Sequence, residues 1–335
     1  MTVTLGVLDQ TPIKSGSNAL EAIKESIELA RLTDKLGYNR YWLAEHHGSS
    51  GLAGSAPEVL INTIASVTKK IRVGSGGIML NHYSPLKVAE VFSMLSLMYP
   101  ERIDLGLGRA PGGNQLISAA MSYGSKIGVE YYPTKITDLI AFLNGAGHAN
   151  KALEGISVSP KVDIPPQVWL LGSSAESAKI AALLGLPFSY AHFIYPDGAK
   201  ETINLYRKKF KKSNILTSPV ANICVATICA EKTSEAEYYA QSRRLWRLQL
   251  SKGDLGPYPT PDEALDYNYT TSELRIIDKN LGACFVGDPK KVKSDIDLMC
   301  KECEVDEVLL LTITHDQCVR SKSYQLIAEA FGLKS

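Results

Sequence analysis

Short apolar runs alternate with amphipathic stretches along almost the whole of this 335-residue chain. Most of the runs are predicted to be strands followed by a helix. Alternation of this kind requires parallel strand pairing, because each crossover helix returns the chain to the same end of the sheet. Eight strands are predicted, at residues 2–8, 40–44, 71–80, 103–108, 168–171, 187–193, 221–229 and 308–312.

The number of strand–helix units predicts the fold class. Eight units fit a (β/α)8 TIM barrel, which takes about 250 residues and leaves roughly 85 for insertions. We place these insertions at about residues 111–166 and 233–282, on the C-terminal face of the barrel. No repeat or linker indicates a second domain, so residues 1–335 are expected to form one domain.

Composition excludes several classes of protein. The chain has 36 Lys and Arg against 35 Asp and Glu, so its net charge of +1 predicts no surface for nucleic acid or anionic lipid. No apolar run approaches the ~18 residues that a membrane span needs. The first residues also lack the basic patch and apolar core of a signal peptide. We therefore expect a cytoplasmic protein.

The six cysteines are predicted to be free thiols. Cys300 and Cys303, followed by His315 and Cys318, have a spacing that resembles a zinc motif. A predicted buried strand at residues 305–312 would carry the two pairs to opposite ends of the fold, whereas zinc needs four converging ligands. No metal is expected.

Polar and glycine-rich residues gather at the C-terminal ends of the predicted strands. Active sites lie at this end of TIM barrels, so these residues predict the position of the functional site. They are Asp9 and Gln10, then Glu45, His46 and His47, then Gly74, Ser75, Gly76, Gly77 and Met79, then residues 106–113 including Arg109, and finally Gly172, Ser173 and Ser174.

The histidine pair and Arg109 each permit two interpretations. His46 and His47 are candidates for metal ligands or for hydrogen-bonded structural histidines, and no further ligand spacing accompanies them. The turn at residues 172–174 precedes a helix, whose N-terminus is suited to an anion. Arg109 would suit the same phosphate, or would form an ordinary surface ion pair. The glycines of residues 106–113 do not predict a Rossmann site, because Pro111 removes a backbone donor.

Three segments in the expected order strongly resemble the bacterial luciferase-like flavin oxidoreductases. The resemblance covers nearly the whole chain and is closest to a non-luminescent subgroup of uncharacterised and natural-product monooxygenases. It implies a (β/α)8 barrel that binds FMN, usually as a dimer, and that transfers one oxygen atom of O2 to a small organic substrate. The segments are Trp42-Leu43-Ala44-Glu45-His46-His47-Gly48, Val73-Gly74-Ser75-Gly76-Gly77-Ile78-Met79-Leu80 and Gly106-Leu107-Gly108-Arg109-Ala110-Pro111-Gly112.

The resemblance also implies roles for single residues. His46 falls at the family's active-site histidine, beside the flavin ring. Gly76 and Gly77 fall where the family carries a non-prolyl cis peptide under the flavin, and Met79 joins them as a cofactor-binding residue. The cofactor's phosphate is expected at Arg109, Gly172, Ser173, Ser174 and Ser177.

One departure from the family narrows the expected activity. Gly108 stands where the light-emitting luciferases have a cysteine next to the flavin, which argues against light emission and leaves monooxygenation open. Reduced FMN is expected to come from a separate NAD(P)H:flavin reductase, because the chain has no intact dinucleotide motif. Two alternatives remain: hydride transfer with a flavin or deazaflavin, and a flavin-binding accessory subunit with little turnover.

Two segments predict properties beyond the site. The third predicted helix, residues 85–98, is apolar nearly all round, which predicts a homodimer unless the chain's own insertions cover it. Residues 252–271 are rich in proline and tyrosine with little periodicity, and are expected to form a mobile lid over the flavin.

Overall fold

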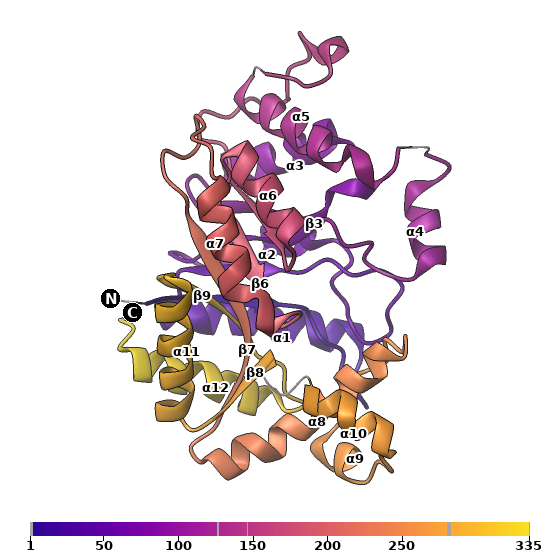
Figure 1. The fold of residues 1–335 in the computed structure, drawn as a ribbon, viewed down its shortest axis with the longest axis vertical. Coiled ribbons are helices and arrows are strands. Elements are labelled where there is room, and N and C mark those ends of the chain that lie inside the picture. The colour runs from indigo at the N-terminus through magenta and orange to yellow at the C-terminus, as the bar shows by residue number, and fades with distance from the viewer. Residues whose placement is uncertain (1–2, 126, 146, 280–282, 335) are drawn as a thin grey trace.

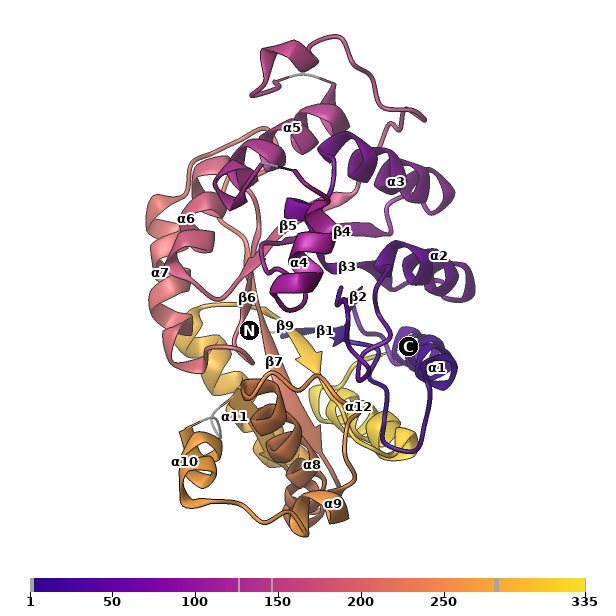
Figure 2. The same cartoon turned by 90° about the vertical axis from the view of Figure 1, so that its right-hand side faces the viewer.

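The computed structural model describes residues 3–125, 127–145, 147–279 and 283–334, and its centre is a closed barrel of parallel strands (Figures 1 and 2). Closure comes from β7, which pairs with β6 on one side and β9 on the other, while β9 pairs with β1. The predicted TIM barrel is therefore confirmed. Its eight strands are β1 (Thr4–Asp9), β2 (Arg40–Leu43), β3 (Arg72–Met79), β4 (Ile103–Gly108), β5 (Gln167–Gly172), β6 (Phe188–Ala191), β7 (Ala221–Cys229) and β9 (Glu307–Leu311).

A further strand, β8 (Cys284–Gly287), lies outside the closed barrel and was not predicted. Among the described strands it pairs with β7 alone, at residues 226–229. β8 has four residues, three of them only partly buried, so its sequence lacks the apolar run that marks the barrel strands. Together with the helix that follows, it extends the wall beside the C-terminal half of β7.

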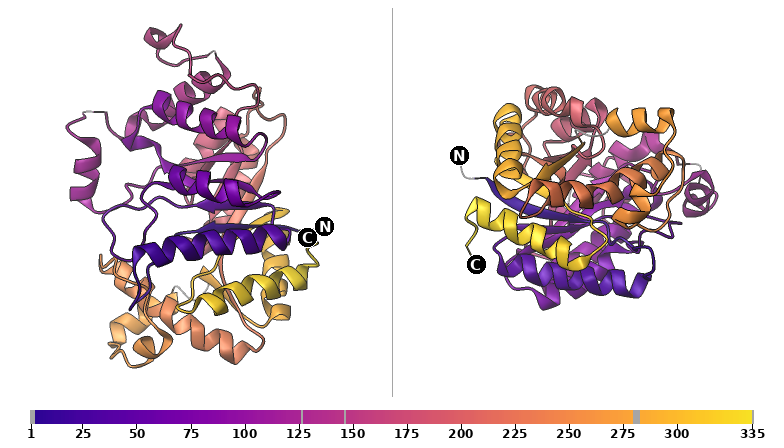
Figure 3. Two further views of the ribbon diagram at one scale, coloured as in Figure 1. Left: turned by 180° about the vertical axis from the view of Figure 1, so that it is seen from behind. Right: turned by 90° about the horizontal axis from the view of Figure 1, so that it is seen from below.

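Helices form a ring outside the barrel, which Figure 2 shows most clearly. The first and last of them lie side by side and join the two ends of the described chain (Figure 3). None of the described helices combines the length and the apolar character that crossing a membrane requires. The ring consists of α1 (Ala19–Lys35), α2 (Pro57–Val67), α3 (Pro85–Met98), α6 (Ala175–Leu184), α7 (Ala199–Lys209), α11 (Pro289–Cys303) and α12 (Gln317–Phe331).

The two stretches predicted as insertions carry helices of their own. The first contains α4 (Gln115–Ser122) and α5 (Tyr132–Asn144), and the second contains α8 (Thr233–Ser251), α9 (Pro261–Leu265) and α10 (Thr271–Lys279). Single 3-10 turns occur at η1 (Leu80–His82), η2 (Val129–Tyr131), η3 (Lys151–Leu153) and η4 (Pro196–Gly198).

The apolar helix α3 is covered in part by the chain itself. It packs on α5 of the first insertion, and Val88, Ala89, Phe92 and Leu95 are buried. Its outer face keeps three large apolar side chains that are more than half exposed, namely Met94, Leu97 and Met98. Homodimerisation through this face stays a prediction.

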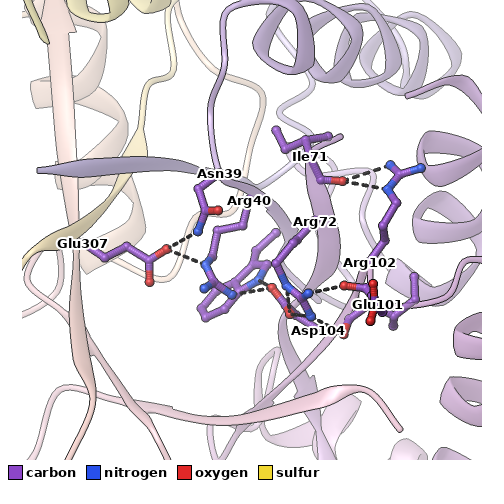
Figure 4. Close-up of polar contacts among 10 residues, drawn as sticks. Asn39, Arg40, Ile71, Arg72, Glu101, Arg102, Asp104 and Glu307 are labelled. Carbon is purple, nitrogen blue, oxygen red and sulfur yellow. Dashed lines mark hydrogen bonds and ion pairs between the residues drawn. The ribbon is translucent and has the colours of Figure 1, made fainter. Parts of the chain in front are cut away.

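A cluster of charged side chains fills the N-terminal end of the barrel (Figure 4). Arg40 Nη1 lies 2.6 Å from Asp104 Oδ2, and Arg40 Nε lies 2.6 Å from Glu307 Oε1. Arg72 Nη2 lies 2.7 Å from the other oxygen of Asp104, Oδ1. Trp42 donates its Nε1–H at 2.9 Å to Oδ2, the oxygen that Arg40 also contacts. These pairs tie together β2, β3, β4 and β9 at the end of the barrel opposite the predicted site.

Candidate functional site

A cavity of about 480 Å³ lies at the C-terminal ends of the barrel strands. Its volume is in the range of small-molecule and cofactor sites. Some residues at the predicted strand ends, among them Asp9, His47, Gly74 and Ser75, are not in its lining. The residues predicted as catalytic or cofactor-binding do lie at its wall, from the ends of four strands and the first turn of α6. These residues are His46, Gly76, Gly77, Met79, Arg109, Gly172, Ser173, Ser174 and Ser177.

The part of the wall contributed by β3 consists of Gly76, Gly77 and Met79. The Gly76–Gly77 peptide is cis, as the resemblance implied, and the pairing with β4 shifts register between Gly76 and Ile78. A Cβ on Gly76 would lie 2.6 Å from Leu8 Cδ1, and a Cβ on Gly77 would lie 2.6 Å from the carbonyl oxygen of Gly106. Both distances are shorter than real contacts. The contact at Gly77 is with backbone, so glycine is required there, whereas a side chain at Gly76 would require Leu8 to move.

A buried carboxylate holds the end of β3 in place. Glu45 is 2% exposed; its Oε2 accepts the backbone N–H of Met79 at 2.9 Å, and its Oε1 accepts the hydroxyl of Tyr83 at 2.6 Å. His47 Nε2 lies 2.7 Å from the same Oε1. Burial, followed by the hydrogen bond and the charge of Glu45, raises the pKa of Tyr83. The sequence analysis located Glu45 at the site without a role, because Met79 and Tyr83 lie in a segment more than thirty residues away.

The two adjacent histidines have different surroundings. His47 is bound to Glu45, which agrees with the structural interpretation. His46 lies on the cavity wall, and its buried Nδ1 makes no hydrogen bond to the described part of the protein. Burial, with a smaller effect from His47, lowers the pKa of His46 to about 4. The imidazole is therefore neutral at physiological pH. No group of three or more metal-ligating side chains occurs among the described residues.

The end of β5 and the start of α6 form a polar corner of the cavity. Ser174 caps α6 by accepting the N–H of Ser177 at 3.3 Å, and the two hydroxyl oxygens are 3.2 Å apart. A Cβ on Gly172 would lie 2.4 Å from Ser177 Cβ, so only glycine lets the helix approach the strand this closely. A capped helix N-terminus of this kind is suited to a phosphate.

Arg109 faces this corner and also takes part in a surface ion pair. Its Nη1 lies 2.6 Å from Oε2 of Glu176, in the first turn of α6, and the Glu176 carboxylate is 65% exposed. The ion-pair interpretation of Arg109 is confirmed, and the pair places the guanidinium beside the helix N-terminus. Phosphate binding by Arg109 stays a prediction. An exposed carboxylate partner is weakly held and leaves the cation accessible to an anion.

The opposite wall of the cavity is mainly apolar. Trp42 and Leu309 are fully buried there, and the thiol of Cys224 joins them. Oε1 of Gln10 is buried without a hydrogen-bond partner among the described residues, so it is an acceptor that remains for a ligand. The sequence located Gln10 at the site without a role. The cavity thus combines the glycine backbone of residues 76–77, an apolar wall and the polar corner at the start of α6. A flat, apolar ring with polar edges fits this combination.

The segment expected to be a lid lies beside the mouth of the barrel. Leu255 accepts the N–H of Gly51 at 2.9 Å, and Tyr258 donates its N–H to Ile13 at 2.8 Å. The side chain of Tyr258 is fully buried and donates its hydroxyl to the carbonyl of Ile313 at 2.9 Å. These bonds anchor residues 255–258 to loops that follow other strands. Movement of residues 252–271 stays a prediction.

Comparison with known proteins gives a consistent family assignment. The model of the luciferase-like monooxygenase family matches residues 3–302. A luciferase-like monooxygenase of Escherichia coli strain K12 is 38% identical over 97% of this chain and 96% of its own. The N-acetyl-S-alkylcysteine monooxygenase of Bacillus subtilis strain 168 is 33% identical over 98% of both chains. The crystal structure of apo-MsnO8 has a TM-score of 0.91 and 38% identity over 99% of both chains.

More distant solved structures share the fold alone. The oxygenating constituent of 3,6-diketocamphane monooxygenase from Pseudomonas putida, solved in complex with FMN, has a TM-score of 0.73 and 18% identity, covering 98% of this chain and 97% of its own. An F420-dependent secondary alcohol dehydrogenase has a TM-score of 0.71 and 16% identity over 99% of both chains.

Proposed function

Because this chain belongs to the luciferase-like monooxygenase family, whose members are flavin-dependent enzymes, we propose that it uses reduced FMN and O2 to oxygenate a small organic substrate. The observation that supports this most directly is that one cavity is lined by the Gly76–Gly77 backbone, by the polar corner at the start of α6 and by the neutral His46. When bound, reduced FMN supplies the electrons with which O2 is activated for transfer to the substrate.

The residues of the cavity would bind the flavin ring, bind its phosphate and exclude water. Gly76 and Gly77 would face the flavin ring, because no side chain intervenes there. Arg109 and the first turn of α6 would hold the phosphate, and the exchange of Glu176 for a phosphate on Arg109 would give a stronger, charge-assisted pair. The apolar wall around Trp42 keeps water from the reacting atoms.

His46 is positioned to hold or move a proton. Its Nδ1 faces no partner among the described residues, and its imidazole is neutral because burial lowers its pKa to about 4. A neutral imidazole can accept a hydrogen bond at one nitrogen and donate one at the other. We propose that His46 acts as the active-site base, or as a hydrogen-bond partner of the flavin or the substrate.

The proposal also covers the source of reduced FMN, the cellular location and the association of two copies. A separate NAD(P)H:flavin reductase supplies reduced FMN, the enzyme acts in the cytoplasm, and two copies associate through the exposed face of α3. The relative that acts on an N-acetyl-S-alkylcysteine supports a small, functionalised organic substrate for this chain too.

The test begins with an absorbance spectrum of protein mixed with FMN and freed of unbound flavin, which is expected to show bound yellow flavin. O2 consumption with photoreduced FMN and a panel of small organic compounds then tests oxygenation. Loss of substrate without O2 uptake, in the presence of a reduced deazaflavin, would favour hydride transfer instead. Flavin binding with no turnover under either condition would favour the accessory subunit.

A further inference from the structure

Gln10, directly after β1, places a buried amide on the wall of the cavity of about 480 Å³. The residue is 8% exposed, and its Oε1 is buried without a hydrogen-bond partner in the described part of the protein. Such a group is unfavourable unless a ligand completes it, because it has lost its contact with water. A half turn of the amide exchanges its oxygen and nitrogen in the same volume, so a ligand can meet either an acceptor or a donor.

The order of the strands places Gln10 across the barrel mouth from the polar corner at the start of α6. Between β1 and β5 lie β2, β3 and β4 on one side and β9, β7 and β6 on the other. The C-terminal ends of β1 and β5 therefore face each other, and Gly76 and Gly77 of β3 lie midway between them. A flavin with its phosphate at the polar corner and its ring over these glycines would leave Gln10 at the end of the cavity beyond the ring.

The backbone around Gln10 is fixed by a buried network. Oδ1 of the fully buried Asp9 accepts the N–H of Thr11 at 2.9 Å and lies 2.7 Å from Nη2 of Arg320. The hydroxyl of Tyr41 donates to the other oxygen of Asp9. Thr11 has a φ of 51°, a left-handed conformation that a β-branched residue adopts only where its surroundings enforce it. The backbone that carries the Gln10 amide is therefore held in place before any ligand binds.

The surroundings of Gln10 indicate an uncharged ligand group. Leu8 and Trp42 line the same cavity and pack in one apolar cluster. The charged residues of its described lining are Arg109, which lies beside the polar corner, and Glu45, whose carboxylate already has three hydrogen-bond partners. A charged group next to Gln10 would be desolvated without a counter-charge, which is costly. A hydroxyl or an amide would exchange a hydrogen bond to water for one to Gln10.

We propose that Gln10 selects the substrate by forming a hydrogen bond with an uncharged hydroxyl or amide group that the substrate carries. The assignment rests on the proposed monooxygenase function, since it concerns the substrate of that same cavity. The apolar part of the substrate would lie against Leu8 and Trp42, and the hydrogen bond would fix its position relative to the flavin ring. An analogue without the polar group would leave the amide unpaired and would bind more weakly for that reason.

The first experiment measures binding in air to protein loaded with oxidised FMN, so that no turnover occurs. Isothermal titration calorimetry compares benzyl alcohol with ethylbenzene, in which a methyl group replaces the hydroxyl at nearly the same shape. The contribution of the shared phenyl group cancels in the ratio of the two dissociation constants. In Gln10→Met this ratio should shift about tenfold in favour of ethylbenzene, because the partner of the hydroxyl is gone.

Two further variants make this test decisive. Gln317→Met is the matched control, because Oε1 of Gln317 is also buried without a partner in the described ranges but lies outside the cavity, so the ratio should not change. Gln10→Asn withdraws the amide by one methylene and should shift the ratio in the same direction, even if the methionine variant does not fold. An unchanged ratio in the Gln10 variants would overturn the proposal. A loss of FMN affinity with an unchanged ratio would assign the amide to the flavin instead.

The second experiment follows O2 consumption by the enzyme with reduced FMN. Small organic compounds are compared in pairs, in which a methyl group replaces the hydroxyl or amide of the first member. The polar members are expected to increase O2 consumption more, and Gln10→Met should raise their KM with little change in kcat. Equal stimulation by both members of each pair would overturn the substrate class. If no compound is oxygenated, the proposed function fails, while calorimetry, with or without FMN, still decides whether Gln10 selects hydrogen-bonding ligands.

Discussion

The carboxylate of Glu45 accepts the backbone N–H of Met79 at 2.9 Å, which ties the segment after β2 to the end of β3 at the wall of the proposed flavin site. Glu45→Ala would leave that buried N–H and the half-buried hydroxyl of Tyr83 without this partner. We expect a loss of about 1–3 kcal/mol in the free energy of unfolding, measured by urea denaturation. Glu45→Gln keeps an acceptor for Met79 and should lose less; equal losses would contradict the role of that bond.

Arg109 is expected to contribute to FMN affinity through the phosphate. Arg109→Ala should weaken FMN binding by about 1.5–3 kcal/mol, or roughly ten- to a hundredfold, in a fluorescence titration. Riboflavin lacks the phosphate, so its affinity should not change. Glu176→Gln is the matched control: it removes the surface partner of Arg109 and should not weaken FMN binding. Unchanged FMN affinity in Arg109→Ala would reject the assignment.

His46 predicts a pH dependence of stability. Burial lowers its pKa to about 4 in the folded protein, whereas an unfolded histidine titrates at about 6.5. Between these values the unfolded state binds more protons, so stability falls as the pH drops from about 6.5 to about 4. His192, whose pKa burial also lowers to about 4, acts in the same direction. His46→Gln should therefore flatten, without abolishing, the pH dependence of unfolding by urea; an unchanged slope would show that His46 is not desolvated.

The exposed apolar face of α3 is expected to be a dimer interface. Leu97→Glu would place a charge between Met94 and Met98 and should shift the protein from dimer to monomer in light scattering at micromolar concentration. Leu183→Glu, on the exposed side of α6, is the control, since that side chain is exposed to a similar extent but lies on another helix. A wild-type protein that is already monomeric would exclude this interface.

We expect that NADPH alone does not reduce the bound flavin efficiently. The strand end at residues 106–111 carries Pro111 in place of a backbone donor, and one cavity must hold both flavin and substrate. Stopped-flow mixing of the FMN-loaded protein with NADPH, with and without an added flavin reductase, measures this directly. Bleaching at tens per second without the reductase, a rate typical of enzymes, would make the chain self-sufficient.

Most barrel strands could be predicted because their central residues are apolar and buried, and a fully buried strand such as β9 has few alternatives. β8 could not, because Cys284 to Gly287 is short and partly exposed and depends on β7 for its pairing. The candidate site was located from strand ends and from family resemblance. The role of Glu45 depends instead on its contacts with Met79 and Tyr83, which come together only in the folded chain and which residue type and spacing do not reveal.

The charged cluster at the N-terminal end of the barrel also selects one alignment of the strands. A slip of β2 by two residues against β3 would keep the same alternation of inward and outward side chains, so hydrophobic burial alone discriminates weakly against it. Such a slip would separate Arg40 from Asp104 and weaken the compensation of buried charges, which is far more costly. The shear of the barrel is thereby specified at one end, and the loops at the other end can diversify without disturbing it.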